Sequence, residues 1–162
     1  MRTSSEHRTH RLAHAIYGLI VLTATVGELR ALGEDLATAA VVIAGAFVVL
    51  VIAHGYSQIV ANTATHDRMP TRTFMVANAL DQLAIALPAA VAIAVLALSE
   101  TGVMSLDVAY DVVLAAAIVV LAATGVLVGR HHDLSRARTV ALGAANVAIG
   151  VVIIGIEVLA SH

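Results

Sequence analysis

The chain alternates between long apolar stretches and short polar breaks. Five stretches reach the length of about 20 apolar residues that a bilayer crossing needs; they cover residues 12–29, 36–60, 74–98, 106–128 and 140–160. None shows the strict alternation of a lipid-facing strand, and a helix satisfies its own backbone hydrogen bonds in hydrocarbon. The pattern predicts an all-α polytopic membrane bundle of five transmembrane helices in a single domain over residues 1–162.

The breaks support this division. Gly33, Glu34 and Asp35 separate the first two stretches, and the next break contains Pro70, which cannot continue a helix cleanly. The first stretch is not expected to be a signal peptide, because it exceeds the usual apolar length and further spans follow it.

The arginines give the expected spans a direction. All nine basic residues are arginines, and eight of them fall before span one, between spans two and three, or between spans four and five. Arg30 alone falls on the other side. This is the positive-inside pattern, which predicts a cytoplasmic N-terminus and an external C-terminus.

Composition agrees with a membrane location. Hydrophobic residues make up 60% of the chain and charged residues 12%, against roughly 25% charged in soluble domains. The mean hydropathy is +0.94. Cysteine is absent, which excludes disulfides and thiolate sites, and a net charge of −2 provides no footprint for nucleic acid. The Ala/Val/Arg-rich, lysine-free composition suggests a bacterial inner (plasma) membrane.

Histidines accompany the arginines at the expected inner face. His7, His10, His131 and His132 fit a solvated basic rim that contacts anionic lipid headgroups. A metal site built from the same histidines is the alternative, since imidazole is a common ligand. The sequence does not choose between these readings, and nothing in it calls for a cofactor.

Ionisable and amide side chains inside the spans are the main functional candidates, because each is costly in lipid and tends to face other helices or water. The depths expected from the helix rise place one group in the inner third of the membrane: His14, His54, Asn78, Asp81, Gln82 and Asn146. Asp81 most needs a partner, and we expect His54 to provide it, directly or through water. The alternative is that these groups only hold helices together.

A second polar level is expected near the outer face. It consists of acidic residues, namely Glu28, Asp107, Asp111 and Glu157. They fit ordinary interfacial charges, or an acidic vestibule that concentrates cations. Small residues on the last span, Gly143, Ala144, Ala148 and Gly150, favour close helix packing or a homo-oligomer.

A limited resemblance adds to this picture. Arg11-Leu12 followed by Gly18, then His54, then Asn78 followed by Leu87-Pro88, is similar to the small bacterial relatives of the lysosomal potassium/proton channel. The family's Phe-Ser-Asp signature is replaced here by Ala15-Ile16-Tyr17, and the family unit has six helices. The resemblance implies a cation-conducting oligomer whose first helix lines the pore, with Ile20 or Leu22 at its neck.

Three classes of function follow. The first is a small channel or transporter for protons or monovalent cations that uses the inner level around His54 and Asp81. The second is a structural or accessory subunit of a membrane complex with no transport of its own. The third is an intramembrane enzyme, for which no phosphate loop, HExxH or GxSxG motif appears; we therefore do not expect an enzyme.

Overall fold

The computed structural model describes residues 4–66, 69, 71–131 and 135–160, without the side chains of residues 4–13, 66, 131, 153–154 and 157–160. All regular structure in this part of the chain is helical. The elements are α1 (Ser4–Leu32), α2 (Leu36–His66), α3 (Arg72–Ala97), the short 3₁₀ helix η1 (Leu98–Thr101), α4 (Leu106–His131) and α5 (Arg136–Ala160). The all-α prediction is confirmed.

Four of these helices are long and apolar enough to cross a membrane within the described residues: the segments His14–Leu32, Leu36–Thr65, Arg72–Thr101 and Leu106–Arg130. Their outward faces are apolar as well. On α2, Val41 is 72% exposed and Ile52 is 65% exposed. Extended apolar faces of this kind are rare on soluble monomers and ordinary where lipid is the solvent.

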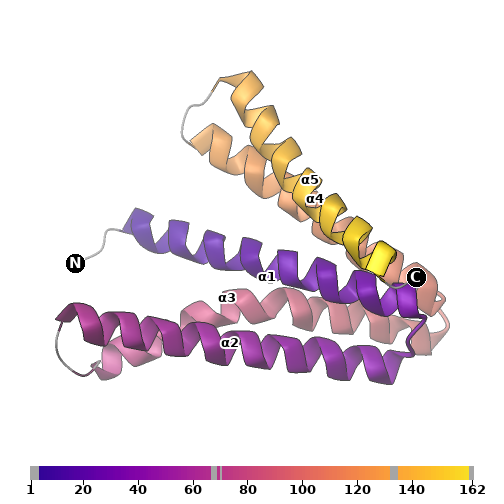
Figure 1. Cartoon of the computed structure of the whole chain (residues 1–162), viewed down its shortest axis with the longest axis horizontal. Helices are drawn as coiled ribbons and strands as arrows, with labels where there is room; N and C mark the ends of the chain where they lie inside the picture. The colour runs from indigo at the N-terminus through magenta and orange to yellow at the C-terminus, as the bar shows by residue number, and fades with distance from the viewer. Residues whose placement is uncertain (1–3, 67–68, 70, 132–134, 161–162) are drawn as a thin grey trace.

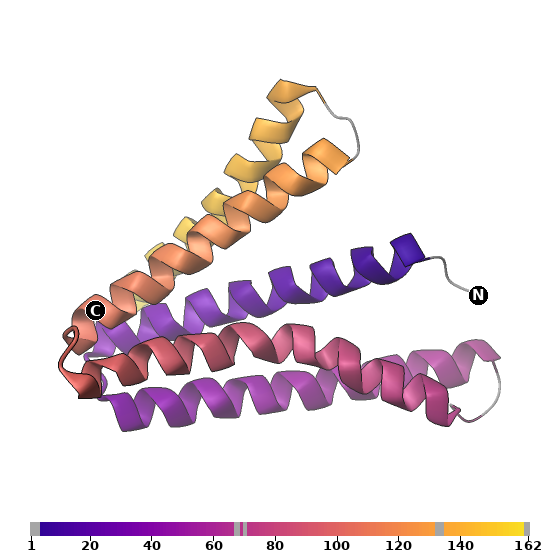
Figure 2. The ribbon, with the colours of Figure 1, turned by 180° about the vertical axis from the view of Figure 1, so that it is seen from behind.

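The helices form two groups that meet at one end (Figures 1 and 2). Helices α1, α2 and α3 lie side by side, and α4 and α5 form a hairpin. The hairpin touches the first group at the end that carries the α1–α2 and α3–α4 connections, which we call the closed end. It diverges toward the opposite end, where the N-terminus and the α2–α3 and α4–α5 connections lie, and which we call the open end.

The apolar core lies toward the closed end, where four helices contribute to it. Leu22, Val26 and Leu29 of α1 pack with Ile43 of α2 and with residues of α3 and α4. A smaller cluster of Leu19, Ala117 and Leu121 continues the contact between α1 and α4. Because the packing concentrates at this end, the hairpin is held there and not along its whole length.

Specific backbone bonds turn the chain at the closed end. The N–H of Gly33 donates to Arg30 and the N–H of Glu34 donates to Leu29, and Gly33 has a φ of 69°. This Schellman motif ends α1, and the positive φ favours glycine. Asp35 then caps α2: its carboxylate accepts the backbone N–H of Thr38, which lowers the pKa of Asp35 below its ordinary value.

Glycines set the closest helix contacts. A Cβ added to Gly18 on α1 would lie 2.8 Å from the carbonyl oxygen of Ile85 on α3. On the hairpin, Gly143 and Gly150 of α5 face α4 side chains, and Gly125 of α4 meets the α5 backbone. The two α5 glycines expected at a seam therefore pack against α4 inside one chain.

Substitution of Gly18 tests the α1–α3 contact. We expect Gly18→Ala to destabilise the protein by about 1–3 kcal/mol, because the methyl group forces two backbones apart. Gly45→Ala is the matched control, since nothing lies within 4 Å of the position of its added Cβ; it should be neutral or stabilising by helix propensity. Unfolding of both variants in detergent micelles measures this, and equal stabilities would contradict the close approach.

Candidate functional site

The close approach of Gly18 and Ile85 brings polar side chains to one level. Helices α1 and α3 both run from the open end to the closed end (Figure 1). One turn before the contact lies His14 on α1, and one turn before Ile85 lies Gln82 on α3. Helix α2 runs in the opposite direction and adds His54 at the same level, through its contact with His14. Three helices therefore meet at a polar layer.

The two histidines contact each other directly. The Nε2 atoms of His14 and His54 lie 2.9 Å apart, and the rings meet edge to face with centroids 4.4 Å apart. His14 is buried, at 8% exposure, and His54 is half-buried. A hydrogen bond between two Nε2 atoms needs one protonated and one unprotonated nitrogen, so this contact holds a single proton between two helices.

A chain of amide bonds lies beside the histidines. Asn78 donates from Nδ2 to the carbonyl oxygen of Gly55 at 3.1 Å, and Gln82 donates from Nε2 to Oδ1 of Asn78 at 3.0 Å. Gly55 follows His54 directly, and its missing side chain leaves room for both residues: Nδ2 of Asn78 and Cγ of Gln82 each lie 3.8 Å from where its Cβ would be. We call His14, His54, Asn78 and Gln82 the histidine–amide cluster.

The remaining inner residues lie around this cluster or apart from it. Asp81 precedes Gln82 on α3 and is half-buried. The hydrogen bond described for His54 goes to His14, and the expected pairing of His54 with Asp81 stays a prediction. Asn146 of α5 donates to the carbonyl oxygen of Leu121 on α4 at 3.0 Å, so its described bond links the hairpin.

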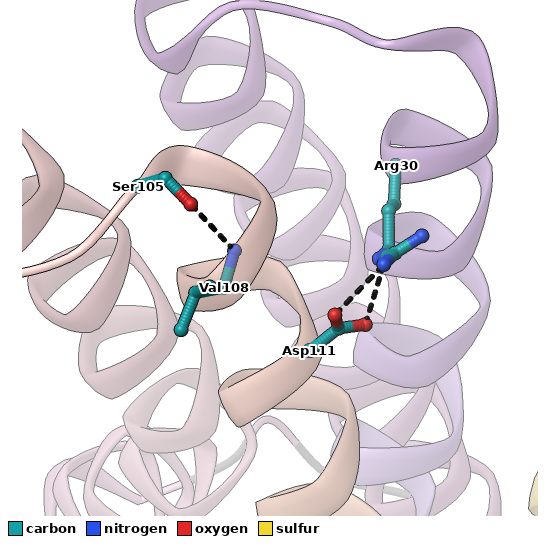
Figure 3. A network of polar contacts seen from close by, with 4 residues as sticks. All are labelled: Arg30, Ser105, Val108 and Asp111. Atoms are coloured by element: carbon teal, nitrogen blue, oxygen red, sulfur yellow. Dashed lines mark hydrogen bonds and ion pairs between the residues drawn. The ribbon is translucent and has the colours of Figure 1, made fainter.

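At the closed end, α1 and α4 are joined by an ion pair (Figure 3). Nη2 of Arg30 lies 2.8 Å from both carboxylate oxygens of Asp111, with side chains 38% and 58% exposed. Glu28 and Asp107 are exposed, and the side chain of Glu157 lies outside the described part. An exposed pair contributes about 0–1 kcal/mol. Its larger effect here is that the positive charge of Arg30 neutralises the negative charge of Asp111, one of the residues expected at the outer acidic level.

No polar path between the cluster and the closed end is apparent in the described side chains. The core on the way is apolar, and the hydroxyl of the buried Thr23 donates to Leu19 of its own helix. A pocket of about 300 Å³ between α1, α3 and α4 is lined by apolar side chains, among them Ala15, Leu19, Leu87, Pro88, Val113 and Ala117. The side chains that the structure describes therefore form no open polar pore through one chain.

Within the described residues no group of three or more His, Cys, Asp or Glu side chains is placed to hold a metal ion. The candidate site formed by His7, His10, His131 and His132 lies outside the described side chains.

Comparison with models of protein families, with curated proteins and with solved structures gives no match for this chain.

Two features of the site were not anticipated from the sequence. One is the partner of His54, since His14 stands only two residues inside the expected first span. The other is the Arg30–Asp111 pair, whose members are 81 residues apart. The sequence does contain one signal for the Arg30–Asp111 pair, because Arg30 is a single basic residue among the acidic residues of the expected outer side.

A double-mutant cycle tests the histidine contact. We expect His14→Ala and His54→Ala each to destabilise the protein, and the double variant to lose less than the sum, with a coupling of about 0.5–2 kcal/mol. Unfolding in detergent micelles measures it. Combining His54→Ala with Thr23→Val, in a separate part of the core, provides the additive control. Strict additivity of the two histidine variants would show that the rings do not interact.

Proposed function

We propose that this protein is a small membrane transporter for protons or monovalent cations, with the His14–His54 pair as its proton-binding element. The observation that carries the proposal is the 2.9 Å contact between imidazoles of two different apolar helices. Histidine changes charge near physiological pH, and ionisable groups inside membrane segments mark ion and proton pathways. The distant resemblance to a potassium/proton channel family favours the same class.

The proposed topology has five crossings, with the N-terminus in the cytoplasm and the C-terminus outside. In its favour, α5 is 25 residues long and exposes Val140, Val151, Val152 and Ile156 as an apolar face like those of the other helices. The distribution of the arginines gives the direction. The open end is then cytoplasmic, and its exposed arginines, including Arg130 and Arg136, face anionic lipid headgroups of the plasma membrane.

A carrier fits the geometry better than a permanently open pore. The apolar core separates the histidine pair from the closed end, and Leu22, expected at a pore neck, is buried in that core at 3% exposure. The α4–α5 hairpin is packed at the closed end and diverges at the open end (Figure 2). In the proposed mechanism this hairpin rocks against α1–α3 and exposes the histidine pair to one side of the membrane at a time, as in alternating access. A homo-oligomer is compatible with this proposal.

The second candidate is an accessory subunit whose polar groups only join helices. The dry core favours it, because the histidine–amide cluster would then be an internal connection between α1, α2 and α3 without a route for ions.

Vesicle flux separates the two candidates. In liposomes with an enclosed pH-sensitive dye and an imposed potential, we expect wild-type protein to move protons, and His14→Ala, His54→Ala and Asp81→Asn to lose this flux. Glu100→Gln, an exposed change in η1, is the control and should retain it. A folded wild-type protein that moves neither protons nor Na⁺ or K⁺ would favour the accessory subunit.

Cysteine labelling tests the topology, since the chain contains no cysteine of its own. In intact cells, a membrane-impermeant maleimide should label Thr101→Cys and a cysteine added after the C-terminus, and should not label Ser135→Cys before lysis. If the C-terminal cysteine is protected together with Ser135→Cys, α5 does not cross the membrane and the chain has four spans.

A further inference from the structure

The contact between His14 and His54 depends on α3, although neither histidine lies on that helix. Helices α1 and α2 touch each other over a smaller extent than each of them touches α3. Most of the packing that holds α1 and α2 in relation to each other therefore passes through α3. The relative position of the two imidazole rings follows from how each of the two helices is docked on the third.

Helix α1 is docked on α3 by a close approach of the two helices. A Cβ added to Gly18 would lie 2.8 Å from the carbonyl oxygen of Ile85, so little space separates the helices at this point. His14 lies one turn before Gly18 on α1. The Gly18–Ile85 contact therefore sets the position of His14 along α3.

Helix α2 is docked on α3 by a directed hydrogen bond. Asn78 donates from Nδ2 to the carbonyl oxygen of Gly55 at 3.1 Å, and Gly55 is the residue next to His54. This oxygen belongs to the backbone of α2, so a bond to it restrains both the sliding and the rotation of the turn that carries His54. Asn78 precedes Ile85 by seven residues, so the two docking points are about 10 Å apart along α3.

Gln82 holds the Asn78 amide in one orientation. A backbone carbonyl oxygen can only accept, so Asn78 must present its Nδ2 group to Gly55. The Oδ1 atom of Asn78 then accepts the bond that Gln82 donates from Nε2 at 3.0 Å, one turn along the same helix. Both ends of the Asn78 amide are thus engaged, and its donor group is directed at α2.

We propose that Asn78 is a positioning residue for the His14–His54 pair, because it holds the turn of α2 that carries His54 at the distance where the two rings meet. The tolerance is small. The two Nε2 atoms lie 2.9 Å apart, and a displacement of α2 by about 1 Å would place them beyond hydrogen-bond distance. The inference rests on the proposed function only in taking this pair as the functional element.

The test is a nitrogen–nitrogen correlation between the two rings, recorded by NMR on ¹⁵N-histidine-labelled protein in lipid bilayers. Asn78→Leu retains a side chain of similar size but removes the donor, and we expect it to lose the correlation. Asn146→Leu is the matched control, because Asn146 also donates to a backbone carbonyl oxygen of a neighbouring helix, that of Leu121 at 3.0 Å. Its bond joins α4 and α5, which carry neither histidine of the pair, so the correlation should be retained.

Unfolding in detergent micelles gives a second measurement. If Asn78 acts through the pair, His14→Ala should lower the free energy of unfolding less in Asn78→Leu protein than in the wild type, because the contact that it removes is already lost. In Asn146→Leu protein, His14→Ala should lower the free energy of unfolding as much as in the wild type.

The outcomes separate the positioning role from the proposed function. Retention of the correlation in folded Asn78→Leu protein, or an equal effect of His14→Ala in both Asn variants, would overturn the positioning role. Loss of the correlation in both Asn variants would also overturn it, because any weakening of the bundle would then have the same effect. If only Asn78→Leu loses the correlation while wild-type protein moves no ions, the positioning role is confirmed and the transport proposal fails.

Discussion

The constraint on which this structure depends is that hydrocarbon offers no water to a polar group. An imidazole or amide within an apolar helix must be satisfied by another part of the protein, because leaving it in lipid costs several kcal/mol. The hydrogen bonds of the histidine–amide cluster serve this requirement by joining α1 to α2 through His14 and His54, and α2 to α3 through Gly55 and Asn78. The polar groups thus connect the three helices that lie side by side in Figure 1.

The same constraint explains the contrast between the two ends of the bundle. At the closed end, apolar side chains of four helices pack together, and the Arg30–Asp111 pair lies at the exposed edge, where water reaches it. The histidine–amide cluster lies farther toward the open end, because His14 precedes the core residues of α1 and α1 runs toward the closed end. The α4–α5 hairpin diverges toward the open end. The histidine pair on the open side of a dry apolar core is the arrangement on which the proposed carrier rests.

Depth along a helix could be predicted from the sequence, whereas the choice of neighbours could not. Counting residues at 1.5 Å each places His54, Asn78 and Gln82 at similar depth, and the structure brings them to one layer. The partner of His54 depends on which helices are adjacent and on how each is rotated. That is set by the close approach of Gly18 to the backbone of Ile85, where an added Cβ would lie 2.8 Å from the carbonyl oxygen, and no spacing rule contains this approach. For the same reason the pairing of Arg30 with Asp111 could not be predicted, since α1 and α4 are distant in sequence.

The glycines of α5 were expected at a helix seam, and only the structure identifies α4 as the facing helix for Gly143 and Gly150.

The central claim is that two imidazoles share one proton between α1 and α2 within the membrane. The most direct measurement is a through-hydrogen-bond nitrogen–nitrogen coupling, recorded by solid-state NMR on ¹⁵N-histidine-labelled protein in lipid bilayers at neutral pH. The account predicts a correlation between Nε2 of His14 and Nε2 of His54 that disappears in His54→Ala. Two uncoupled rings that exchange freely with water would contradict it.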